Sequence, residues 1–168
     1  MSYTGFNPIV NIINDIGYEW DVDGDGNQES CLTITYPSGP VKGNICYIPM
    51  YTTDEVRSGE LPTMPFIEFT HVTGPGSVHN IQGDVRYDQA YIDMNIYAAL
   101  NDEIDIMKTW MKTVEDEIYN QIMTWRHGIS DCSWVEPIDN REIIEMDGKK
   151  VIYHNIISLY ANRYDGPY

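Results

Sequence analysis

The sequence predicts an α+β fold, a mostly antiparallel sheet with a short N-terminal helix and one long amphipathic helix packed on one face. Three observations lead to this expectation. Residues 84–100 alternate between apolar and polar side chains, as a strand with one buried face does. Residues 102–125 repeat apolar side chains at spacings of three and four, which indicates a helix. The other apolar segments are short and bounded by Gly and Pro, which favours hairpins.

The short helix is predicted over residues 8–16. Asn7 is a favourable N-cap residue, and Pro8 suits the first helical position because its missing N–H costs no hydrogen bond there. Gly17 follows as a helix stop. The side chains expected to be buried are Ile9, Val10, Ile12, Ile13 and Ile16.

The first half of the chain is expected to contain three strands. Residues 31–36 alternate in polarity, and a turn rich in Pro and Gly should join them in a hairpin to a second strand over residues 44–51. Residues 66–72 are the third strand. Residues 52–65 are expected to be a surface loop and residues 73–83 a mobile connection, because both segments contain several Gly and Pro residues.

The long strand over residues 84–100 is expected to have two different faces. One face is apolar and belongs to a core; its residues are Ala90, Ile92, Met94, Ile96, Ala98 and Leu100. The other face is rich in tyrosine, which offers apolar area with a polar tip and therefore suits a protein partner. On this face we expect a subunit interface at Tyr87, Tyr91, Asp93 and Tyr97.

The second half should form the long helix and a closing hairpin. Asn101 or Asp102 caps the helix, whose apolar stripe comprises Ile104, Met107, Met111, Val114, Ile118, Ile122 and Trp125. Residues 133–138 are a predicted strand. Residues 142–146 and 151–164 should form a hairpin, because an Asp-Gly pair at 147–148 favours its turn. The last strand is long enough to pair with residues 84–100.

Composition narrows the possible functions. The 168 residues fit a single domain, residues 1–168, and carry 26 acidic against 10 basic side chains, a formal charge of -16. This charge repels phosphate and disfavours a protein that reads nucleic-acid sequence. We expect a soluble cytoplasmic chain, because neither a membrane helix nor a signal peptide is evident. The three cysteines lack CxxC spacing, which suggests neither a disulfide framework nor a zinc site.

The acidic segment over residues 21–29 has two interpretations. Asp21, Asp23 and Asp25 are spaced like the first ligands of a calcium loop, which would make the chain a calcium-dependent binding module. The twelfth loop position, however, holds Leu32 in place of a bidentate glutamate. The other interpretation is an acidic, glycine-rich hairpin turn, which also suits the strand that follows, and we favour it.

The sequence does not indicate an enzyme. Its four histidines show no metal-ligand spacing, the glycines fit no phosphate-binding motif, and no nucleophile elbow is present. We therefore predict no catalytic residue, no metal site and no cofactor. A small hydrolase that uses paired acids is a further alternative, which would require a deep pocket with two carboxylates.

The order of elements and three short segments resemble one known family. The segments are residues 64–69 (MPFIEF), 83–87 (GDVRY) and 91–97 (YIDMNIY). Together with the two helices and the C-terminal hairpin, they resemble the tail terminator (tail completion) proteins of long-tailed viruses of bacteria and archaea. The resemblance spans most of the chain, and its motifs are patterns, not invariant signatures. The 21–29 and 52–65 segments depart from the shorter family members.

The resemblance implies a structural virion protein without catalysis. It implies a ring, usually a hexamer, that caps the head-proximal end of the tail tube, ends tube polymerisation and joins tail to head. The implied partners are other copies of the chain, the tail tube protein and the head connector or closure protein, while viral DNA passes through the lumen without specific binding. The implied location is the virion, after assembly in the host cytoplasm. A head-closure or connector adaptor of the neck is the alternative among structural proteins.

Overall fold

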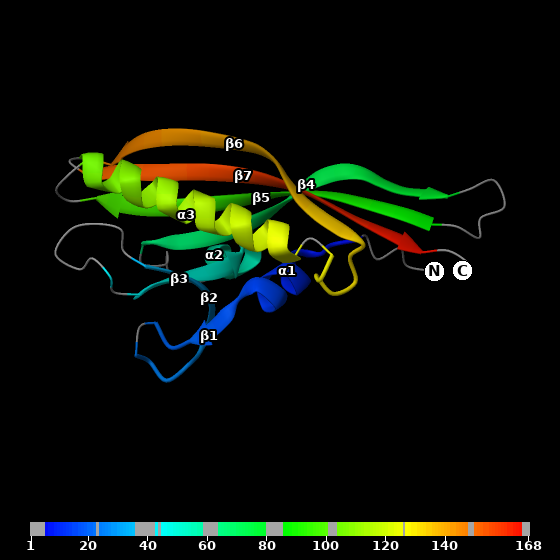
Figure 1. Cartoon of the computed structure of the whole chain (residues 1–168), viewed down its shortest axis with the longest axis horizontal. Coiled ribbons are helices and arrows are strands. Elements are labelled where there is room, and N and C mark those ends of the chain that lie inside the picture. Colours follow the sequence, from blue (N-terminus) through cyan, green and yellow to red (C-terminus); the bar gives the residue numbers. More distant parts are fainter. Residues whose placement is uncertain are drawn as a thin grey trace.

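A computed structural model describes residues 6–22, 24–35, 43, 45–58, 64–79, 86–100, 104–125, 127–147 and 150–165. These residues form one seven-stranded sheet and three helices (Figure 1). The strands are β1 (Tyr18–Trp20), β2 (Glu29–Thr35), β3 (Ile45–Thr52), β4 (Phe66–His79), β5 (Arg86–Leu100), β6 (Trp134–Asp147) and β7 (Lys150–Asp165). The helices are α1 (Ile9–Ile16), α2 (Thr53–Ser58) and α3 (Ile104–Trp125).

The sheet has the strand order β1-β2-β3-β4-β5-β7-β6. All neighbouring strands are antiparallel except β3 and β4, which are parallel. The fold is therefore predominantly β with a mixed sheet, and the expected hairpins β2–β3 and β6–β7 are confirmed. The expected pairing of the last strand with the long strand is also confirmed, because β7 pairs with β5 along its whole length.

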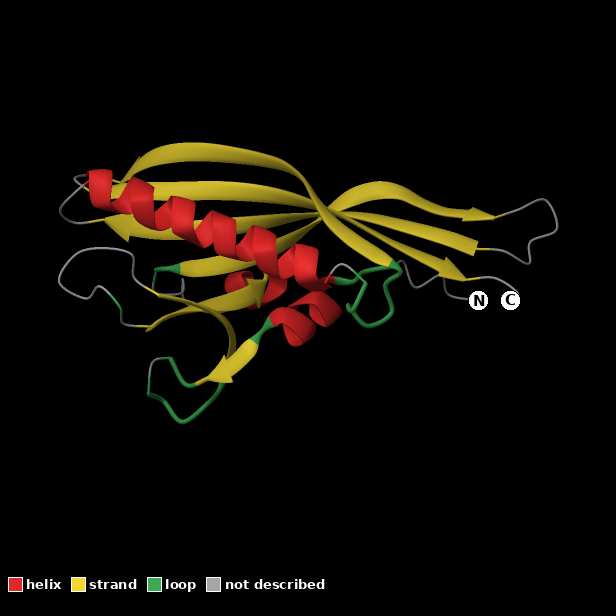
Figure 2. Cartoon of the chain, in the orientation of Figure 1, coloured by secondary structure: helices red, strands yellow, loops and turns green. Residues whose placement is uncertain are grey.

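The structure has three helices where the sequence predicted two on one face, and the additional helix lies on the other face. Helices α1 and α3 pack against each other, and α3 runs diagonally across the sheet (Figure 2). The additional helix α2 packs on β3 and β4 and lies behind the sheet when viewed from α3 (Figure 1). The hydroxyl of Thr53 in α2 contacts the side chains of Glu68 and Thr70, which point away from α3.

Helix α1 forms close to its predicted position, with one difference in its buried stripe. The Asn7 side chain accepts a hydrogen bond from the N–H of Ile9, and Gly17 ends the helix. Four isoleucines of the stripe are buried, but Val10 is 56 % exposed, so its predicted burial was wrong. A helix has 3.6 residues per turn, which places Val10 outside the arc covered by the other apolar residues.

Helix α2 replaces part of the loop predicted over residues 52–65. The N–H of Thr52 donates to the carboxylate of Glu55, and the N–H of Glu55 donates to the Thr52 hydroxyl. This reciprocal pair is a capping box, a local signal that sequence analysis overlooked. Residues 59–63 lie outside the described part of the chain.

Two strands are longer than predicted. Strand β4 continues through residues 73–79, which we expected to be a mobile connection, and a register irregularity between Val72 and Gly76 accommodates the intervening Gly and Pro. Strand β6 joins the two predicted segments 133–138 and 142–146 into one strand with an irregularity between Pro137 and Asp139. Residues 80–85, 101–103 and 148–149, which include the predicted helix cap and part of the predicted turn, lie outside the described residues.

The core lies between the sheet and helices α1 and α3. Val114, Ile118 and Ile122 of α3 are buried, as predicted for its apolar stripe, whereas the side chains of its other predicted core residues lie outside the described part. From the sheet, the even-numbered side chains of β5 between Ala90 and Ala98 face this core and are at most 2 % exposed. We call this side of the sheet the covered face.

Candidate interaction surface

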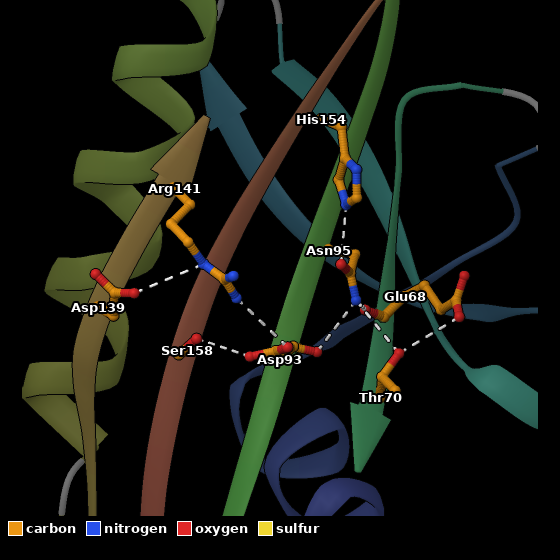
Figure 3. A network of polar contacts seen from close by, with 8 residues as sticks. All are labelled: Glu68, Thr70, Asp93, Asn95, Asp139, Arg141, His154 and Ser158. Carbon is orange, nitrogen blue, oxygen red and sulfur yellow. Dashed lines mark hydrogen bonds and ion pairs between the residues drawn. The ribbon is translucent and has the colours of Figure 1, made fainter. Parts of the chain in front are cut away.

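The opposite side of the four long strands carries the candidate site, which we call the open face. Its described side chains come in register from β4, β5, β7 and β6. They are Phe66, Glu68, Thr70, Val72, Tyr91, Asp93, Asn95, Tyr97, His154, Ile156, Ser158, Tyr160, Glu136, Asp139, Arg141, Ile143 and Glu145. Figure 3 shows the polar contacts at its centre.

One end of the open face is a row of stacked rings. Tyr97 lies between Phe66 and His154, with ring centroids 5.0 Å and 4.3 Å away and nearly parallel planes. Tyr51 of β3 contacts Phe66 edge-on. Burial, followed by the nearby carboxylates of Glu68 and Glu145, raises the pKa of the Tyr97 phenol. This row links four strands through their side chains.

The centre of the open face is a hydrogen-bonded network (Figure 3). The Asn95 amide nitrogen donates to the backbone carbonyl of Glu68 and to the hydroxyl of Thr70, each at 3.3 Å. Ser158 donates to the Asp93 carboxylate at 2.7 Å. Arg141 lies between Asp93 and Asp139, at 3.8 Å and 3.6 Å. At these longer distances Arg141 contributes charge balance more than directed hydrogen bonds.

His154 connects the network to the row of rings. Its Nε2 lies 2.9 Å from the Asn95 side-chain oxygen, and its Nδ1 lies 3.7 Å from a carboxylate oxygen of Glu145. Burial lowers the pKa of the imidazole, and Glu145 and Glu68 only partly offset that effect. His154 is therefore a buried imidazole of this face that becomes charged only below its usual pKa of 6.5.

The four predicted interface residues do not occupy equivalent environments. Tyr91 pairs with Tyr160, and their ring centroids are 5.4 Å apart. Asp93 and Tyr97 lie on the same face but are engaged by the neighbours described above. The backbone of Tyr87 pairs with Tyr164 farther along β5, and its side chain lies outside the described part.

The sequence alone does not indicate that Arg141, Glu145 and His154 belong to the same surface. Their positions depend on the register in which β7 pairs with β5 and β6, which places His154 opposite Tyr97. Alternation alone shows which residues share a face of one strand, but it does not set the register between strands that are distant in sequence.

The acidic segment over residues 21–29 forms the turn between β1 and β2. The Asp21 carboxylate accepts hydrogen bonds from the N–H groups of Gly24 and Gly26, both of which have positive φ angles. Glu29 accepts one from Val22. The favoured hairpin-turn interpretation thus agrees with the geometry, in which these carboxylates hold the backbone of the turn. Asp23, a residue of the calcium alternative, lies outside the described part.

The described residues offer little support for a metal centre or a paired-acid active site. No group of three or more potential metal-ligating side chains comes together among them. A groove of about 320 Å³ lies between β2, β3 and α3. Among the described residues that line it, Glu117 carries the one carboxylate, and the others are Thr33, Thr35, Ile45 and Thr113.

Comparisons with known proteins do not assign a family. No protein-family model matches the chain, and no curated protein matches it. Within the described part of the chain, no helix combines the length and the apolar character needed to cross a membrane.

Proposed function

We propose that the chain is a subunit of a homo-oligomeric ring, a hexamer by the family resemblance, that caps the head-proximal end of a viral tail tube. In this role it ends tube polymerisation and joins the tail to the head connector or closure protein. The proposed role is structural and involves no catalysis, and the proposed location is the virion.

The observation that carries the proposal is the difference between the two sides of the long strands. Helices α1 and α3 bury one side, whereas the other presents tyrosines and polar groups, with Val72 and Ile143 each 40 % exposed. Aromatic and apolar groups on a partly exposed surface are characteristic of protein interfaces. A subunit of a ring needs two different complementary surfaces, and the open face can supply one of them.

The net charge of the chain is consistent with a lumen through which DNA passes. Its 26 acidic against 10 basic side chains give a formal charge of -16. Such a field repels the phosphates of nucleic acid at short range. We therefore expect neither sequence-specific nor general DNA binding.

The length of the strands provides a second contact region. Beyond the bulge in β4, residues Gly76–His79 pair with Arg86–Gln89 of β5, and these pair with Asn162–Asp165 of β7. Figure 1 shows this three-stranded part extending past the helices as a narrow projection. A projection of this kind can reach a neighbouring subunit.

Sedimentation velocity and electron microscopy of the purified chain test the proposal. We expect a ring with a central hole, and its population should increase with salt because screening reduces repulsion between subunits of charge -16. A chain that stays monomeric at all salt concentrations, including with tube protein present, would contradict the proposal.

A matched pair of tyrosine variants tests the role of the open face. Tyr91→Ser should weaken association about tenfold or more, because it removes an aromatic group from the proposed interface. Tyr119→Ser removes an equally large side chain that is 50 % exposed on α3, and it should leave association unchanged. Equal effects of the two variants on association would show that the open face is not part of the interface.

A tube-assembly assay distinguishes a tail terminator from a neck adaptor. Addition of the chain to polymerising tail tube protein should limit tube length, with the chain located at one end. Binding to the head connector without any effect on tube length would favour the head-closure or adaptor alternative.

A further inference from the structure

The hydrogen bonds of Asn95 determine the tautomer of His154 (Figure 3). The Asn95 amide nitrogen lies close to the carbonyl oxygens of Glu68 and Asp93, which are acceptors only. The NH₂ group must therefore be on that side, and the side-chain oxygen of Asn95 faces His154 Nε2 at 2.9 Å. Because that oxygen accepts, Nε2 must carry the proton of the neutral imidazole.

The other ring nitrogen of His154 is then an acceptor without a donor. His154 is 8 % exposed, and its Nδ1 is buried and has no hydrogen-bond partner among the described residues. The nearest ionisable group is the carboxylate of Glu145 at 3.7 Å, which is also an acceptor. Two lone-pair acceptors that face each other leave a position suited to a donor.

We propose that this acceptor pair, His154 Nδ1 and the Glu145 carboxylate, receives a lysine or arginine side chain from a second copy of the chain that covers the open face in the ring. The inference rests on the proposed function for the placement of that second copy. The chemistry of the contact depends only on the geometry of the face.

The charges around the pair favour a cationic donor over a neutral one. Glu68 of β4 and Asp93 of β5 add negative charge, and Arg141 of β6 lies between Asp93 and Asp139. Tyr97 stacks on the imidazole and carries no charge near neutral pH. The Glu145 side chain is 51 % exposed, so its rotation can admit a donor that bonds to both acceptors.

Protonation of His154 should abolish this contact. The added proton occupies Nδ1, which then becomes a donor and repels an incoming ammonium or guanidinium group. Since the pKa of His154 lies below its usual 6.5, the loss should occur on the acidic side of that value.

Nitrogen NMR of the histidine-labelled chain tests the tautomer directly. Near neutral pH we expect His154 to carry its proton on Nε2 and to leave Nδ1 unprotonated. A proton on Nδ1, or a charged imidazole at this pH, would overturn the inference whether or not the chain forms rings.

Binding of a tetralysine peptide tests the contact. The peptide should shift the His154 Nδ1 resonance. Glu145→Gln should weaken peptide binding about tenfold for two reasons: one charge-assisted contact is lost, and the amide of the substituted side chain can itself donate to Nδ1. Glu142→Gln is the matched control, since Glu142 is an exposed residue of the same strand but lies on the covered face, opposite Asn155 and near the carboxylate of Glu115. This control should change binding less than about twofold.

The outcomes separate this inference from the proposed function. Equal effects of the two glutamine variants, or an unshifted His154, would overturn the inference even if rings form. Peptide binding that depends on Glu145 in a chain that never forms rings would support the contact and overturn the ring.

Discussion

The covered and open faces of the same sheet are held together by different interactions. On the covered face, β5 contributes Ile92 and Met94, which are fully buried against an apolar core. On the open face, the same strand contributes Asp93 and Tyr97, which are held by hydrogen bonds and ring stacking. The open face is thus ordered by hydrogen bonds and ring stacking among its own side chains, whereas the covered face is ordered by burial against an apolar core.

Among its described residues, the covered face contains two buried polar side chains, Asp88 and Asn155, and Asp88 gives the largest expected effect. Asp88 is fully buried, and Arg163 donates to its carboxylate from Nε at 3.0 Å and Nη2 at 2.8 Å. Arg163→Ala should lower the free energy of unfolding by about 3–5 kcal/mol, because it removes the cation that donates two hydrogen bonds to a fully buried carboxylate. Urea unfolding at a fixed protein concentration measures the loss.

Arg141→Ala is the corresponding variant on the open face. Arg141 is 55 % exposed, and its carboxylate neighbours are 3.6 Å and 3.8 Å away. Its loss should cost less than about 1 kcal/mol of unfolding free energy. Equal losses for the two arginine variants would contradict the distinction between the faces.

Two adjacent isoleucines of β7 allow the covered and open faces to be compared within one strand. Ile157 belongs to the apolar core on the covered face, whereas Ile156 lies on the open face beside Asn95 and Arg141. Ile157→Ala should cost about 3–4 kcal/mol of unfolding free energy, because core packing is lost around a cavity. Ile156→Ala should cost about 1–2 kcal/mol, because Ile156 is not part of the apolar core and the long, 55 % exposed side chain of Arg141 can close over the space. A larger loss for Ile156 would mean that the open face holds the tighter core.

The sequence predicted the covered face better than the open face. Alternation in β5 and helical spacing in α3 each indicate which side chains are buried, and Ile92, Ile118 and Ile122 are buried as predicted. These patterns are local and strong. Val10 shows their limit, since an apolar residue adjacent to a buried stripe need not belong to it.

Features that depend on pairing between distant strands could not be predicted. Strand β4 crosses a Gly-Pro-Gly segment because β5 pairs with it on both sides of a bulge, and that pairing outweighs the local turn preference. The contact between His154 and Asn95 joins residues 59 positions apart. By contrast, the capping box of α2 was present in the sequence, and its signal could have been used.

The pH dependence of stability gives the smallest expected effect and tests the interior of the open face. Burial lowers the pKa of His154 in the folded chain, so the folded chain binds fewer protons than the unfolded chain just below pH 6.5. The free energy of unfolding should therefore fall as pH falls from about 6.5 through the lowered pKa.

The variant His154→Gln isolates this effect, because the other titrating groups of the chain contribute equally to both proteins. On acidification the wild type should lose unfolding free energy relative to the variant. This relative loss should level off below the pKa that His154 has in the folded chain. Glu145→Gln should enlarge the shift, because Glu145 favours the charged imidazole. A wild type that gains stability relative to the variant on acidification would mean that the Glu145 carboxylate outweighs burial, and the imidazole would then be a donor on both nitrogens.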